Sequence, residues 1–311
     1  MKASRLPWRW VSNILIVAGL GWVGYLLVTT VDDPKQFIPD SIAWLIVATG
    51  LVALSLAANI WLFNLFLHTE LGRCYPLGLV ARLSVAGQLL RYLPGRIWGV
   101  AYQISAARER IPAIQLARAN ADLMVFSLFG SAIVAFLLLG YQSGWHWVTL
   151  VTLSTTGIVF LGSFFLGGAN WLLRLFASLL PDKARRILEK LATGQLSISQ
   201  MVLIFLIFIS SWIIYLIGWN LLGLVFSNFS EVNFTALCAF YTLASIIGIV
   251  SAITPAGLGV REAAFVMLAT GSMSPEVVAF FAVFGRIWLI SVEIFLLIFI
   301  VSLLPNIKEA N

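Results

Sequence analysis

Long apolar runs, each about the length of a membrane-crossing helix, alternate along this chain with short polar stretches. A bilayer core about 30 Å thick needs roughly 20 apolar residues to be crossed by a helix. By this criterion six runs are predicted to be full transmembrane helices, with approximate bounds 11–28, 42–67, 117–139, 147–168, 201–226 and 277–304. We therefore predict an all-α integral membrane protein.

Two further apolar stretches, at about 77–106 and about 234–270, are interrupted by proline and glycine. Their breaks consist of Pro94 and Gly95 in the first, and of Pro255, Gly257 and Gly259 in the second. Proline removes a backbone donor and glycine favours turns, so both residues interrupt a helix. Non-helical backbone at membrane depth is tolerated only when it is buried in protein or lines an aqueous cavity. We expect both segments to be broken helices that line one site.

Composition supports lipid as the solvent. The chain is 61% hydrophobic and only 10% charged, whereas a soluble domain is about 25% charged. Its 12 Trp and 22 Phe residues suit anchoring at the headgroup level. The net charge of +6 is spread through short loops, so it indicates topology and no nucleic-acid partner.

One stretch between the spans, at about 170–196, has a different character. Within it Ala184, Ile187, Leu188 and Leu191 fall on one helical face, while basic residues fall mostly on the other. This pattern is typical of an amphipathic helix lying on an anionic leaflet. A solvated linker helix explains the same pattern equally well.

Basic residues in the loops decide between two topologies. If both broken segments crossed fully, the basic stretches 106–118 and 170–196 would lie outside, against the positive-inside tendency. If each segment enters and leaves on the same side, the cytoplasmic parts hold 14 Lys and Arg residues and the external loops hold one. We therefore predict six spans, two re-entrant segments, and cytoplasmic N- and C-termini.

The re-entrant interpretation makes the two broken segments enter from opposite sides. Each is followed by a full span, which predicts repeat-like halves at about 77–140 and 234–304 within a single membrane domain, 1–311. In transporters, such inverted repeats place the site near the midplane, between broken helices.

Charged residues within the apolar segments are the candidates for function, because charge at membrane depth costs several kcal/mol. They are Arg91, Arg96, Arg118, Asp122, Arg261, Glu262, Arg286 and Glu293. Arginines outnumber acids among them, which suits an anionic ligand, and the guanidinium fork matches phosphate. The alternative is that Arg118–Asp122 and Arg286–Glu293 are structural ion pairs and that Arg91 and Arg118 extend to the interface.

Other chemistry has no support in the sequence. The two cysteines, Cys74 and Cys238, and the two histidines, His68 and His146, form no set with metal-ligand spacing. There is no nucleotide-binding glycine loop and no nucleophile with a base. We expect neither an enzyme nor a cofactor.

The same motifs carry a family resemblance. They are Leu93-Pro94-Gly95-Arg96 with Trp98, Arg118-x3-Asp122, Thr254-Pro255-Ala256-Gly257-Leu258-Gly259 with Arg261-Glu262, and Gly285-Arg286. In these the chain resembles the lysylphosphatidylglycerol synthase transmembrane family. The resemblance implies a flippase-like protein of a bacterial or archaeal plasma (inner) membrane. We expect no aminoacyl transfer, because the synthase domain of that family is absent.

The expected function is therefore translocation of a lipid between leaflets. Arg96 and Arg261 would hold the phosphate of an anionic phospholipid or of a polyprenyl-phosphate-linked sugar, and Glu262 and Arg286 would complete the polar lining. Two alternatives stay open. One is a proton-coupled transporter of a small anion; the other is a membrane partner of a glycosyltransferase or another lipid-modifying enzyme.

Overall fold

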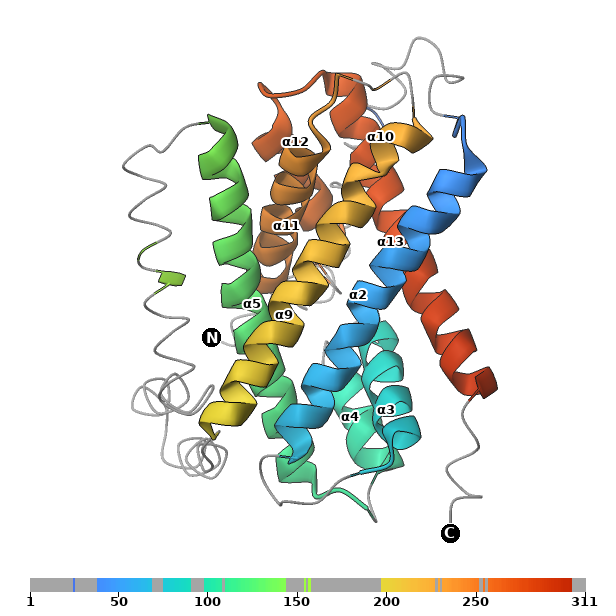
Figure 1. Ribbon diagram of the computed structural model, residues 1–311, viewed down its shortest axis with the longest axis vertical. Coiled ribbons are helices and arrows are strands. Elements are labelled where there is room, and N and C mark those ends of the chain that lie inside the picture. The colour runs from blue at the N-terminus through green and yellow to red at the C-terminus, as the bar shows by residue number, and fades with distance from the viewer. Residues whose placement is uncertain are drawn as a thin grey trace, which may run out of the picture. The chain divides into compact units, whose positions relative to one another are not determined.

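The computed structural model describes residues 25, 38–68, 75–90, 98–107, 110–143, 154, 156–157, 197–226, 229, 231–251, 254 and 257–303. Throughout this part of the chain the regular secondary structure is helical, and an isolated bridge between Thr270 and Met273 is the only β pairing (Figure 1). The all-α prediction is confirmed. The predicted spans 11–28 and 147–168 and the amphipathic segment 170–196 lie, apart from isolated residues, outside the described residues.

Four described helices are long and apolar enough to cross a membrane. They are α2 (Ile42–His68), α5 (Ala113–Ser143), α9 (Ile198–Asn220), which the short α10 (Leu222–Val225) extends, and α13 (Pro275–Leu303). Each matches one of the predicted spans to within a few residues. The chain therefore has the helices of an α-helical membrane protein, and the total of six spans stays a prediction.

Both broken segments are pairs of shorter helices. The first consists of α3 (Leu77–Leu90) and α4 (Trp98–Ala106), and the second of α11 (Phe234–Ser251) and α12 (Val260–Ala269). These arms have 14, 9, 18 and 10 residues, so α3, α4 and α12 are shorter than the roughly 20 that a span requires, and α11 is at the lower limit.

The chain divides into two compact units, which are described separately. Unit 1 comprises Met1–Val52, Leu90–Arg96 and Tyr215–Val292, and unit 2 comprises Ala53–Leu89, Ile97–Ile214 and Glu293–Asn311. The hairpin α3–α4 belongs to unit 2 and the hairpin α11–α12 to unit 1. Whether the halves 77–140 and 234–304 form a repeat stays a prediction.

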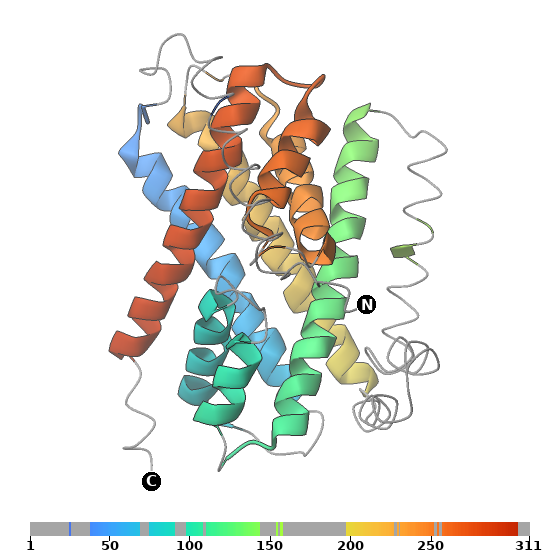
Figure 2. The ribbon, with the colours of Figure 1, turned by 180° about the vertical axis from the view of Figure 1, so that it is seen from behind.

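In unit 2, α3 and α4 form an antiparallel hairpin, visible from behind in Figure 2. The Gln103 side-chain amide donates a hydrogen bond to the carbonyl of Leu83, at 3.0 Å. Closer to the turn, a Cβ added to Gly99 would lie 2.4 Å from the carbonyl oxygen of Gly87. Leu83 is paired with Gln103 and Gly87 with Gly99, so contacting residues come closer in sequence toward the turn. The two arms therefore run in opposite directions. Glycine at 99 allows their backbones to touch.

In unit 1, α11 and α12 form a second antiparallel hairpin with the same kind of contact. A Cβ on Gly257 would lie 2.8 Å from the Cα of Gly248. Gly257 and Gly259 have φ angles of 71° and 79°, in the left-handed region that favours glycine. These two glycines reverse the chain after α11 and start α12, so the predicted break at this point is confirmed.

Aromatic rings fill the core of each unit. In unit 2, Phe126 packs edge-to-face on Phe66 and Phe208, within a larger apolar cluster from α2, α3, α5 and α9. In unit 1, Phe226 packs edge-to-face on Phe281 and Phe284 of α13. These contacts pack α5 against α2 and α9 within unit 2, and pack the first part of α13 against Phe226, the residue after α10, within unit 1.

Candidate functional site

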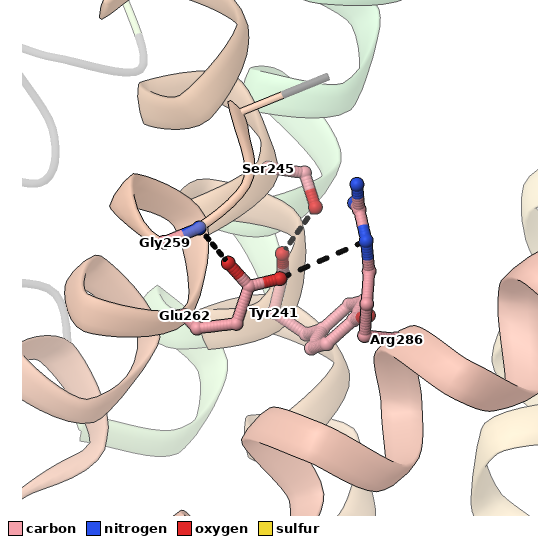
Figure 3. Close-up of polar contacts among 5 residues, drawn as sticks. All are labelled: Tyr241, Ser245, Gly259, Glu262 and Arg286. Carbon is pink, nitrogen blue, oxygen red and sulfur yellow. Dashed lines mark hydrogen bonds and ion pairs between the residues drawn. The ribbon is translucent and has the colours of Figure 1, made fainter. Parts of the chain in front are cut away.

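The start of α12 is organised by Glu262. Its Oε2 accepts a hydrogen bond of 2.7 Å from the backbone N–H of Gly259, the residue that caps the helix (Figure 3). An acid in the first turn is stabilised by the partial positive charge of a helix N-terminus. Glu262 therefore holds the glycine break closed onto the helix.

The same carboxylate contacts the last long helix. Its Oε1 lies 3.7 Å from Nε of Arg286 on α13, as Figure 3 shows. Glu262 is 2% exposed and Arg286 is 6% exposed. A buried charge is retained only when it is paired or hydrogen-bonded. The ion pair therefore ties the hairpin to α13, a partner for Arg286 that sequence spacing did not indicate.

Arg261 faces an aromatic ring. Its guanidinium carbon lies 4.1 Å from the centroid of the Tyr241 ring on α11, which is cation–π distance. Among the described residues no carboxylate lies within ion-pair distance of Arg261. Within the described part of the chain, the positive charge of Arg261 is therefore stabilised by a cation–π contact with the ring and is not neutralised by an acid.

Three buried polar atoms at this break find no hydrogen-bond partner among the described residues: Oγ1 of Thr254, Nε of Arg261 and Oε1 of Glu262. Thr254 is 1% exposed and its carbonyl accepts a bond of 3.2 Å from the N–H of Gly257. Buried polar groups are normally hydrogen-bonded, so orphaned ones need an explanation such as a water or a ligand. The break in unit 1 is therefore a polar centre in which these three atoms could still form hydrogen bonds.

Unit 2 holds a second polar group, on α4 and α5. Arg118 and Asp122 are 5% and 7% exposed, and Nε of Arg118 lies 3.5 Å from Oδ2 of Asp122, as their i, i+4 spacing predicts. Between them in sequence, and so on another face of α5, Asn120 donates a hydrogen bond of 2.6 Å to Oε1 of Gln103. Gln103 thus joins the two arms of its hairpin to the following helix, whereas Glu262 in unit 1 joins α12 alone to the following helix.

The count of cytoplasmic basic residues includes Arg82, from a predicted loop at 68–82, and Arg118, from the stretch 106–118. Both are buried within helices, Arg82 in α3 and Arg118 in α5, so the loop assignment of Arg82 is wrong, while the predicted helix that carries Arg118 and Asp122 is confirmed. The apolar pattern indicated a loop because arginine is charged. In the structure the long side chain of Arg82 is instead buried beside packed neighbours. Removing these two residues from the loop count leaves the excess of basic residues on the predicted cytoplasmic side.

The structure therefore tests only part of the predicted site. Gly257, Gly259, Arg261, Glu262 and Arg286 come together in unit 1. Glu293 is buried further along α13, at 4% exposed, in the part that belongs to unit 2. The predicted site residues Arg91, Pro94, Gly95, Arg96 and Pro255 lie outside the described residues.

Sequence reasoning missed Tyr241 and Gln103. Gln103 could have been found as an amide within an apolar helix, which calls for a hydrogen-bond partner. Tyr241 has no sequence signal, because its role depends on Arg261 folding back over it.

Comparison of the chain with protein-family models, with curated proteins and with solved structures finds no match. The resemblance to the lysylphosphatidylglycerol synthase transmembrane family therefore stays a prediction that depends on the motifs alone.

Proposed function

We propose that this protein is a lipid translocator, which moves an anionic phospholipid or a polyprenyl-phosphate-linked sugar across a bacterial or archaeal plasma membrane. One observation carries the proposal: Arg261, at the break of a hairpin in an apolar protein, has an aromatic partner and, among the described residues, no acidic one. An anionic headgroup would supply the missing negative charge.

The chemistry of the site favours phosphate as that anion. The guanidinium of Arg261 offers a planar fork of donors, and its Nε is buried with no hydrogen-bond partner among the described residues. Helix N-termini also favour anions, but here the N–H of Gly259 is already used by Glu262. The arginine side chain rather than the helix terminus is therefore the proposed ligand.

The membrane arrangement is part of the same proposal. The second helix of each hairpin, α4 with 9 residues and α12 with 10, is too short to cross the bilayer. Each hairpin would therefore enter and leave on one side. The headgroup would pass through the polar interior while the lipid tails stayed in the bilayer. With the basic loops inside, both termini would be cytoplasmic.

Proton-coupled transport of a small anion is a second candidate, favoured by the burial of Glu262. Its carboxylate has one oxygen on Gly259 and the other without a hydrogen-bond partner in the described part of the chain. A proton on that second oxygen would weaken the ion pair with Arg286 and so couple protonation to movement of α12.

Reconstitution into vesicles tests the proposal. Tail-labelled fluorescent phosphatidylglycerol, phosphatidylcholine and a fluorescent polyprenyl-phosphate sugar would be followed by dithionite quenching of the outer leaflet. We expect quenching beyond the outer-leaflet fraction for an anionic probe, and its loss in Arg261→Gln. Arg110→Gln, in the connection between α4 and α5, is the matched control and should retain activity.

Two outcomes would count against the proposal. Movement of no probe above protein-free vesicles would exclude lipid translocation. Phosphate or chloride uptake driven by a pH gradient, with no lipid movement, would favour the coupled transporter.

A further inference from the structure

Tyr241 occupies the centre of the polar cluster in unit 1. It is 2% exposed, and its ring lies 4.9 Å from that of Trp219 and 5.7 Å from that of Phe265, measured between centroids. On the side of α13, a Cβ added to Gly285 would come within 2.8 Å of Cε2 of Tyr241. The ring is therefore held on several sides by packed groups and has little freedom to turn.

The guanidinium of Arg261 lies on this fixed ring, 4.1 Å from its centroid. An arginine side chain is flexible, and ordering it on binding costs free energy. Because the guanidinium is already ordered against a rigid ring, most of this free-energy cost is absent when a ligand binds.

We infer that Tyr241 is a positioning residue that makes this site selective for anionic headgroups over headgroups that carry a cation. The inference rests on the proposed function and adds a substrate class to it. Headgroups with an ammonium or trimethylammonium group are recognised by open aromatic faces. In this protein the face of Tyr241 is covered by the chain's own cation, which repels a second positive charge.

The test is the ratio of two transport rates in the same vesicles. Tail-labelled phosphatidylglycerol carries one negative charge, and tail-labelled phosphatidylcholine has the same tails with a trimethylammonium group. The variants are Tyr241→Phe, Tyr241→Leu and Arg261→Gln, each alone, with Tyr241→Leu also combined with Arg261→Gln. Thermal unfolding in detergent reports whether each variant is folded.

Tyr241→Phe keeps the ring, so we expect the wild-type preference for phosphatidylglycerol. Tyr241→Leu removes the ring face and should lower that preference roughly three- to thirty-fold, the range for a cation–π contact. Arg261→Gln uncovers the ring, so it should lose phosphatidylglycerol movement and gain in relative rate for phosphatidylcholine. In the Arg261→Gln background, Tyr241→Leu should lower the phosphatidylcholine rate.

A ratio unchanged in folded Tyr241→Leu, with Arg261→Gln still inactive on phosphatidylglycerol, would overturn the positioning role and leave the proposed function standing. Equal loss of both rates in Tyr241→Leu would show a purely structural role and would also overturn the inference. If wild-type protein moves neither of these lipids nor the fluorescent polyprenyl-phosphate sugar, the proposed function itself fails.

Discussion

The ion pair between Glu262 and Arg286 should be a measurable part of the stability of unit 1. At the observed 3.7 Å, two unit charges attract by about 4.5 kcal/mol at an effective dielectric constant of about 20. Removing one partner of a buried pair costs about 3–5 kcal/mol, because the remaining charge is left uncompensated. Glu262→Gln removes the charge and keeps an oxygen for the N–H of Gly259, so it isolates the ion pair from the helix cap.

We expect Glu262→Gln to lower the free energy of unfolding by about 2–4 kcal/mol, slightly below the bare attraction because desolvation of the acid is relieved. Arg286→Gln should have a similar effect. The double variant should be little worse than either single one, with a coupling of about 2–4 kcal/mol. Glu262→Leu removes the cap as well and should cost about 1 kcal/mol more.

The assay is reversible unfolding in mixed detergent and sodium dodecyl sulfate micelles, followed by circular dichroism for the wild type and the four variants. Additivity of the two single changes, within about 0.5 kcal/mol, would refute the pairing. A high-salt repeat is the control, because a buried pair is screened much less than a surface pair.

Two further predictions concern the hairpin of unit 2. Gly99→Ala should lower the unfolding temperature by several degrees, because its Cβ would lie 2.4 Å from the carbonyl oxygen of Gly87, while the control Gly50→Ala, with open space around it, should be neutral or stabilising by up to about 1 kcal/mol. Gln103→Leu and Asn120→Leu should each cost about 1–3 kcal/mol in the micelle assay, since each removes the hydrogen bond between the two amides and leaves the remaining amide one bond short, and their double variant should cost less than the sum. Equal thermal shifts in the two glycine variants, or additive amide costs, would contradict these contacts.

Much of the helical plan could be predicted from hydrophobicity alone. Four predicted spans correspond to α2, α5, α13 and the combined α9 and α10, because a lipid-facing helix must be apolar over its whole length. The second break was predictable from Gly257 and Gly259, since only glycine adopts their left-handed conformation easily. Arg82 was misassigned to a loop because of its charge, although apolar residues continue on both sides of it within α3.

The sequence predicted which charged residues belong to the candidate site, but not all of the ion pairs that they form. The rarity of charge in apolar segments singled out Arg118, Asp122, Glu262 and Arg286, and the burial of all four agrees with a structural or functional role. The i, i+4 spacing was enough to pair Arg118 with Asp122, because one helix brings them together.

By itself the sequence determined the class of protein, the four described long helices and the break at Gly257 and Gly259, since these depend on side-chain polarity and on backbone freedom near each residue. Only the tertiary structure decided that Glu262 meets Arg286 and that Arg261 lies on the ring of Tyr241. These contacts join α12 to α13 and to α11. Their partners are about 20 residues apart along the chain, so the packing of helices, rather than any local spacing, brings them together.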